Sequence, residues 1–159
     1  LSDSRLADCT FSECRFFGCS VSGVKSEDSE IKFAEFTDCT LVGVDWADFM
    51  SGSRFADPIQ RLTDCRLKYN NFVDMSFRKF DFSGSDYTGS LFAECILSEC
   101  SFNGCPLRDT EFFKCDLRKA DFRNTAGHRI DIISCKMKGA RFSYADAADL
   151  LGVLEIKLE

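Results

Sequence analysis

Cysteines are the residues of this 159-residue chain with the most obvious chemical potential, and there are ten of them. Thiolates can bind zinc, form disulfides or act as nucleophiles. In the segment "LFAECILSECSFNGC", residues 91–105, a cysteine stands at every fifth position. Structural zinc ligands are usually spaced by about two to four residues, and helices and strands repeat near 3.6 and 2 residues. A spacing of five therefore indicates another kind of periodic structure.

Other catalytic residue sets are missing from the sequence. His128 is the only histidine, and no Ser/His/Asp set, glycine-rich phosphate loop or HxxxH motif accompanies it. We interpret His128 as a surface corner residue. The sequence therefore predicts no enzyme, no metal site and no cofactor.

Large apolar residues repeat with the same period of five, and we name their place in each five the central position. The first series is Leu1, Leu6, Phe11, Phe16, Val21, Ser26, Ile31, Phe36, Leu41 and Trp46. The second series is Leu62, Leu67, Phe72, Phe77, Phe82, Tyr87, Phe92, Leu97, Phe102, Leu107, Phe112, Leu117 and Phe122, and it resumes after Gly127 with Ile132, Met137 and Phe142. The step from Trp46 to Leu62 is three fives plus one residue, which places a phase break at 47–61.

The residue two before each central position is nearly always small, and we name it the small position. All ten cysteines occupy small positions, and within the two series no charged residue stands at a central or small position. An unpaired charge in a core would cost several kcal/mol, on the order given for buried ions. Two positions of each five are therefore predicted to face a dry interior and three to face water.

This pattern resembles the pentapeptide-repeat family, whose usual consensus is A(D/N)LXX. The segments "KADFR" (119–123) and "GSDYT" (84–88) are similar to that consensus. The resemblance implies an all-β fold, a right-handed quadrilateral parallel β-helix of about seven coils in which four fives complete one coil. Residues 20 apart should then stack, so we expect Phe72, Phe92, Phe112 and Ile132 on one wall and Leu62, Phe82, Phe102, Phe122 and Phe142 on the opposite wall.

In such a solenoid the cysteines are predicted to be small, buried, reduced residues. Pairs 20 apart, such as Cys95 and Cys115, would be stacked neighbours with parallel side chains, which disfavours a bridge. Free thiols favour a cytoplasmic location. A metal site or a redox switch is the alternative interpretation.

The last residues break the period and divide the chain into a repeat solenoid, 1–142, and a C-terminal segment, 143–159. The sequence "YADAADLLGVLEIKLE" (144–159) predicts a short helix followed by an edge strand. One interpretation is a cap over the open end of the solenoid. The segment also resembles the tail of gyrase-protecting pentapeptide proteins, which implies a homodimer interface formed by Ala147, Leu150, Leu151, Val153, Leu154, Ile156 and Leu158.

Charge is unevenly distributed, because residues 1–60 hold 11 acids and 5 bases while the remaining residues are balanced. We expect an acidic partner-binding face made of Asp3, Asp8, Glu13, Glu27, Asp28, Glu30, Glu35, Asp38 and Asp45. Direct binding of nucleic acid is not expected, since DNA-binding proteins have basic channels. Membrane association is not expected either, because no apolar run approaches the roughly 18–20 residues of a membrane span.

The cysteine-rich segments "CTFSECRFFGC" and "FFKCDLRKADF" resemble the Qnr, McbG and MfpA group of the family. That resemblance implies a protein that binds DNA gyrase or topoisomerase IV by partial DNA mimicry and protects it from quinolones or toxins, or modulates it. A general scaffold or adaptor with a non-topoisomerase partner is the alternative.

The phase break is a candidate recognition loop, because loops on rigid scaffolds often carry recognition. Its residues of interest are Phe49, Met50, Arg54, Asp57 and Pro58. We expect Phe49, Met50, Arg54 and Pro58 to be exposed outside the five-residue period. The alternative interpretation is a passive bulge.

Overall fold

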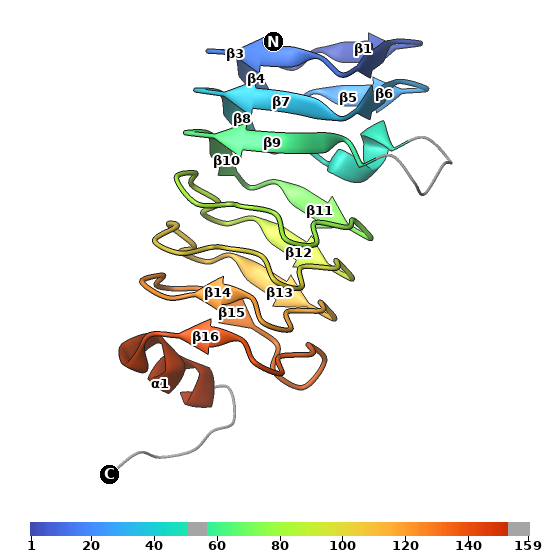
Figure 1. Ribbon diagram of the computed structural model, residues 1–159. Helices are drawn as coiled ribbons and strands as arrows, with labels where there is room; N and C mark the ends of the chain where they lie inside the picture. The colour runs from blue at the N-terminus through green and yellow to red at the C-terminus, as the bar shows by residue number, and fades with distance from the viewer. Residues whose placement is uncertain (51–56, 153–159) are drawn as a thin grey trace.

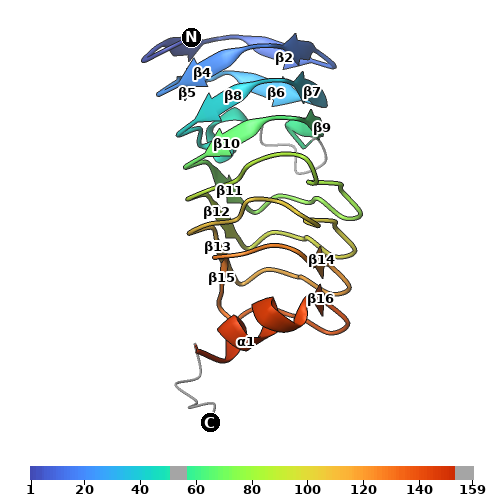
Figure 2. The same ribbon diagram turned by 90° about the vertical axis from the view of Figure 1, so that its left-hand side faces the viewer.

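The computed structural model describes residues 1–50 and 57–152, without the side chains of 148, 149, 151 and 152. The chain winds into a stack of coils, with the N-terminus at one end and the helix α1 (Tyr144–Gly152) at the other (Figures 1 and 2). The predicted parallel β-helix of about seven coils with a short C-terminal helix is confirmed. No helix in the described part of the chain is long and apolar enough to cross a membrane.

Corners recur because the residue two after most central positions adopts a left-handed backbone conformation. Glycine fills some of these corners, such as Gly104 with φ +71°. Asp, Glu, Asn and Lys fill most of the others, including Asp8 (φ +52°) and Lys119 (φ +60°). Each corner redirects the chain after three extended residues, so that the side chain of the central residue points inward.

Short parallel strands form the walls of the coils. Their bounds are β1 (Arg5–Ala7), β2 (Thr10–Ser12), β3 (Arg15–Phe17), β4 (Ser20–Ser22), β5 (Lys25–Glu27), β6 (Glu30–Lys32), β7 (Ala34–Thr37), β8 (Thr40–Val42), β9 (Ile59–Thr63), β10 (Arg66–Lys68), β11 (Asn71–Val73), β12 (Leu91–Ala93), β13 (Glu111–Phe113), β14 (Asp121–Phe122), β15 (Arg129–Ile130) and β16 (Arg141–Phe142). A 3-10 helix, η1 (Trp46–Phe49), interrupts them.

Four walls run along the rod. The first wall contains β1 and β5, then η1, then the sheet β11–β12–β13–β15. The second contains β2 and β6 and continues with the bridges Ser76↔Ile96↔Asp116↔Lys136. The third contains β3–β7–β9 and later β14–β16, and the fourth contains β4–β8–β10.

The register of these strands shows how the phase break is accommodated. On either side of it partners are 20 residues apart, as in Leu6↔Ser26 and Phe92↔Phe112. Across it they are 26 apart, as in Phe36↔Leu62. The break therefore adds six residues to one coil without changing the order of the walls.

A second irregularity corrects the predicted first wall. Ile130, not Ile132, pairs with Phe112, and Ile130 is fully buried while Ile132 is only half-buried. Ala126 still bridges to Pro106, and the coil is two residues shorter directly after it. The two residues are regained in a later turn, in which the Cys135 N–H donates a hydrogen bond to the Asp131 carbonyl. Strict counting in fives misses this because the deletion and the insertion cancel.

Aromatic rings fill the centre of the C-terminal coils. Within a wall they stack, with ring centroids 4.4 Å apart for Phe82 and Phe102 and 5.1 Å apart for Phe92 and Phe112. Rings of opposite walls meet edge to face, as Phe92 and Phe102 do at 5.7 Å. Each buried ring contributes roughly 1.5–3 kcal/mol from its apolar area, so these coils are stabilised without cross-links.

Small positions have a second role besides filling space. In the C-terminal coils the side chain donates a hydrogen bond to a central carbonyl 23 residues earlier, from Cys100 Sγ to Phe77 O (2.6 Å), from Ser90 Oγ to Leu67 O (2.6 Å) and from Thr110 Oγ1 to Tyr87 O (2.8 Å). Cysteine, serine and threonine share a donor of similar reach, which explains why they alternate at this position.

All ten cysteines are free thiols. Seven are buried, whereas Cys9, Cys14 and Cys19 are half-buried, so the expectation of complete burial is wrong for these three. They belong to the first coil, which has a neighbouring coil on one side only within the described structure.

Candidate protein-interaction surfaces

The nine acidic residues predicted as one face lie on different walls. Glu27 lies on the first wall, Glu30 on the second and Glu35 on the third. Three of the nine are also ion-paired with bases beside them: Glu27 with Arg5, Glu30 with Lys32 and Glu35 with Arg15. The structure therefore brings only some of the nine together.

One row of carboxylates is continuous, and we name it the acidic ridge. It consists of the corner residues that follow the first wall, Asp8, Asp28, Asp48, Asp74 and Glu94. All five are exposed. Equivalent residues of neighbouring coils stack at roughly the strand spacing of 4.8 Å, so the ridge presents a line of carboxylates, with Asp48 lying within η1 and not at a left-handed corner. At the C-terminal end of this line Glu94 is ion-paired with Lys114 at 3.3 Å. Sequence reasoning included Asp8 and Asp28 and missed the other three, which only the register across the phase break aligns.

The predicted recognition loop is partly wrong, because Phe49 and Pro58 are buried. Phe49 ends η1 and is 2 % exposed, and Met50 packs against the core. The side chain of Asp57 accepts a hydrogen bond from Ser76 N (3.3 Å), and burial raises its pKa. Arg54 lies outside the described residues.

The predicted dimer interface is described only in part. Ala147 and Leu150 of α1 are half-buried, and Leu150 packs against the core. The side chain of Leu151 and the residues Val153, Leu154, Ile156 and Leu158, with the expected edge strand, lie outside the description. The helix begins after Ser143, whose hydroxyl bonds to the Asp146 carboxylate.

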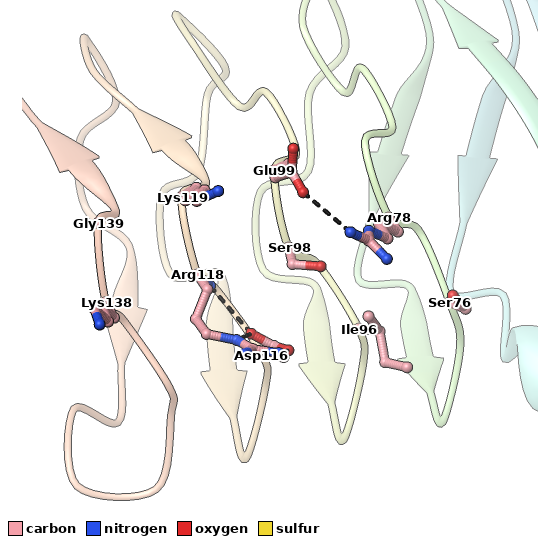
Figure 3. Close-up of a pocket in the computed structure, with 10 residues that line it drawn as sticks. All are labelled: Ser76, Arg78, Ile96, Ser98, Glu99, Asp116, Arg118, Lys119, Lys138 and Gly139. Carbon is pink, nitrogen blue, oxygen red and sulfur yellow. Dashed lines mark hydrogen bonds and ion pairs between the residues drawn. The ribbon is translucent and has the colours of Figure 1, made fainter.

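The second wall of the C-terminal coils is basic, and we name it the basic wall. Its outward residues include six bases, Arg78, Lys79, Arg118, Lys119, Lys136 and Lys138, and only two acids, Glu99 and Asp116. Six of these eight residues, all except Lys79 and Lys136, border a shallow groove of about 730 Å³ together with Ser76, Ile96, Ser98 and Gly139 (Figure 3).

Hydrogen bonds within the basic wall occupy both acids. Arg118 donates from Nε and Nη2 to the two Asp116 oxygens at 2.8 and 2.6 Å, and these bonds lower the pKa of Asp116. Arg78 donates to Glu99 at 3.3 Å (Figure 3). In the described part of the chain, no ion pair involves the ammonium groups of Lys119 and Lys138. The sequence contained a signal for this wall, since these bases align once the chain is divided into coils of 20.

Residues with potential for catalysis or metal binding include the Cys, Asp and Glu side chains and the single histidine. Within residues 1–50 and 57–152, no group of three or more His, Cys, Asp or Glu side chains is placed to bind a metal. His128 is not the surface corner expected from the sequence: its half-buried ring lies 5.8 Å from those of Phe122 and Phe142.

A family model matches the C-terminal part of the chain. Residues 82–150 match the family model described as a pentapeptide repeat region. A trypsin-treated variant of QnrB1, a plasmid-mediated fluoroquinolone resistance protein, aligns with 16 % identity over 100 % of this chain and 98 % of its own, with a TM-score of 0.38.

Two cyanobacterial pentapeptide repeat proteins also align. Rfr23 from Cyanothece 51142 has 10 % identity over 88 % of each chain and a TM-score of 0.33. HetL from Nostoc sp. strain PCC 7120, involved in heterocyst differentiation regulation, has 11 % identity over 89 % of this chain and 84 % of its own, with a TM-score of 0.28. No curated protein sequence matches the chain.

Proposed function

Because the chain carries the pentapeptide repeat, we propose that it is a non-enzymatic rod whose acidic ridge binds a type II topoisomerase, DNA gyrase or topoisomerase IV, in place of part of a DNA duplex. The resemblance of its cysteine-rich segments to the gyrase-interacting group supplies the partner. The observation that carries the proposal is the ridge itself, five exposed carboxylates of which four follow strands paired in register.

A rigid backbone makes the ridge suitable for this role. Asp8 and Asp28 follow paired strands in register, and so do Asp74 and Glu94. The backbone N–H groups of Asp8, Asp74 and Glu94 are hydrogen-bonded to the next coil as well, as in the bond from Asp74 N to Ala93 O (3.0 Å). Charges held at fixed intervals lose little entropy when they meet a complementary basic channel.

Mimicry of DNA would be partial. Seven coils span about 34 Å at the strand spacing, and a duplex of that length carries about 20 phosphate charges. The chain has a net charge of −6. The ridge would therefore replace one phosphate strand over a short length, and the shape of the rod would contribute the remaining specificity.

A homodimer joined through α1 would place two such ridges at the distal ends of a longer rod. The half-buried Leu150 and Ala147 support this arrangement, because they leave apolar surface at the C-terminal end. Sedimentation analysis of the full chain should show a dimer that Leu151→Glu converts to a monomer. A monomeric unmodified protein would refute it.

The ridge is tested by charge reversal in a supercoiling assay with purified gyrase and topoisomerase IV, with and without ciprofloxacin. We expect the protein to alter supercoiling or drug inhibition at micromolar concentration. Asp28→Lys/Asp74→Lys should weaken this effect about ten-fold, as loss of two charged contacts implies. Lysine fits these corners, because Lys79 and Lys114 already adopt the same backbone conformation.

The matched control is Asp38→Lys/Asp64→Lys, which changes the same charge at exposed corners of the third wall. It should leave the effect within about two-fold, since surface changes away from a contact are nearly neutral. Equal losses in both variants would mean that net charge, not the ridge, is recognised. If the unmodified protein affects neither enzyme, the scaffold alternative is favoured. The basic wall also supports that alternative, because a DNA mimic does not need a basic surface.

A further inference from the structure

The basic wall has no role in the proposed mimicry, and we propose that it binds an acidic segment of another protein, rich in Asp and Glu, in extended conformation. Six bases against two acids give this wall an excess of four positive charges. The rest of the molecule must therefore carry the opposite excess, since the whole chain has a net charge of −6. A local field of opposite sign on an acidic protein is a specific feature and not a consequence of composition.

The groove has free cations at one end. Lys138 follows Arg118 in the same row of the next coil, and Lys119 stands at the corner beside Gly139 (Figure 3). A Cβ atom at position 139 would lie 3.4 Å from Lys119 Cγ, in van der Waals contact, so the Lys119 stem runs past the glycine corner. Arg118 and Arg78 are already paired with Asp116 and Glu99. Lys119 and Lys138 are therefore the cationic groove side chains that can donate hydrogen bonds to a carboxylate of a partner.

The other groove residues favour a protein segment over nucleic acid. Ile96 is 46 % exposed in the middle of the groove and offers an apolar contact between the charged groups. Ser76 is exposed close by and can hydrogen-bond to a peptide. In contrast, Glu99 and Asp116 would lie against a continuous phosphate backbone, whose affinity depends on uninterrupted neutralisation by Lys and Arg.

The acidic surfaces around the groove limit the length of the polyanion that can bind in it. A long polyanion such as DNA would extend over neighbouring acidic surfaces, including the acidic ridge at the adjacent corner. A short acidic segment can lie within the groove alone. Charge complementarity therefore selects a compact acidic peptide.

Fluorescence anisotropy tests this directly with a short fluorescein-labelled poly-glutamate peptide and a single-stranded oligonucleotide of the same charge. We expect the peptide to bind the full chain more tightly than the oligonucleotide. Lys119→Glu/Lys138→Glu should weaken peptide binding about ten-fold or more, because each lysine loses an attraction and gains a repulsion. Glutamate suits the corner at position 119, since Glu94 and Glu99 occupy equivalent corners.

Arg61→Glu/Arg66→Glu is the matched control. It makes the same change in charge at two exposed arginines of the third and fourth walls, for which no ion pair occurs within the described residues. It should change peptide affinity by less than about three-fold through the long-range field alone. Thermal unfolding followed by circular dichroism checks that both variants are folded.

Three outcomes would overturn the proposal. They are absence of peptide binding at millimolar concentration, tighter binding of the oligonucleotide than of the peptide, and equal weakening by the two double variants. If a variant does not fold, chemical-shift mapping of the peptide on the unmodified protein decides instead. The proposal requires shifts confined to the basic wall, and shifts elsewhere contradict it. Neither readout depends on a topoisomerase.

Discussion

The N-terminal coils (1–50) and the C-terminal coils (62–142) follow the same repeat but differ in how well it is packed. In the first coil Phe11 and Phe16 are half-buried, whereas Phe92 and Phe102 in the middle of the rod are completely buried. An apolar cavity of about 110 Å³ lies among the N-terminal central residues. The acidic excess thus lies on the less tightly packed part of the rod.

Hydrogen-bonded turns are also more frequent in the C-terminal coils than in the N-terminal coils. In the C-terminal coils the N–H of a small position often closes a tight turn on the preceding central carbonyl, as from Cys105 to Phe102 (2.9 Å) and from Ala120 to Leu117 (3.1 Å). In residues 1–45 of the described structure no such four-residue turn is closed. Five-residue periodicity is therefore sufficient to form a coil, but ring stacking and closed turns determine how stable the coil is.

The largest expected effect on stability comes from removing one aromatic ring from each region. Phe102→Ala should lower the free energy of unfolding by about 3–5 kcal/mol, because it leaves a cavity between Phe82 and Phe122. Phe16→Ala should cost about 1–2 kcal/mol, since its ring is already partly in water. Urea unfolding followed by far-UV circular dichroism measures both.

The control for these variants is Phe17→Ala, whose ring is 73 % exposed and should be replaceable with little effect. Equal losses for Phe16 and Phe102 would contradict the difference in packing between the two regions.

Buried thiols give a pH-dependent test. Burial raises the pKa of Cys100 and of Cys105 to about 12 from an ordinary value of 9.0. Above pH 9 the unfolded chain loses these protons while the folded chain keeps them, so unfolding becomes more favourable as pH rises towards 12. Stability should therefore fall over this range, as measured by urea unfolding at a series of pH values.

Cys100→Ser/Cys105→Ser should reduce this alkaline loss, because serine does not titrate there and Ser90 already makes the equivalent bond. Cys9→Ser/Cys14→Ser in the half-buried N-terminal coil is the comparison and should leave most of the loss. The opposite ranking of the two pairs would contradict the assignment of the effect to buried thiols.

The smallest expected effect is a gain in the N-terminal region. Ser26 occupies a central position of the first wall, between Leu6 and Trp46. Every other coil has a large side chain at this place. Ser26→Leu should raise the free energy of unfolding by about 1 kcal/mol, which is typical of filling an underpacked site. A loss of stability would show that the hydroxyl's bond to Ser29 O (3.1 Å) is needed there.

Much of the fold could be predicted from the sequence. The spacing of Phe82, Phe92 and Phe102 determined which side chains face inward, because a charge at those positions would be too costly to bury. The resemblance to the repeat family then supplied the number of walls. The two irregular coils were not predictable in the same way: Ile130 replaces Ile132, and Phe49 is buried instead of exposed.

The interaction surfaces were less predictable than the core. The sequence located the acidic excess in residues 1–60, but it treated nine carboxylates on several walls as one face and overlooked Asp74 and Glu94. It also counted residues 61–159 as neutral, which hid the basic wall. Net charge along a chain does not specify a surface, because neighbours in sequence point to different walls.

The inside of the rod is therefore predictable from residue types alone: the period, the dry central shaft and the small positions. The tertiary structure decided the outside, namely which charges from different coils stand together. The physical reason is that burial constrains each residue separately through its own desolvation. A surface patch, by contrast, depends on the register between distant segments, and the register across 47–61 follows only from how Trp46 and Phe49 pack against the next coil.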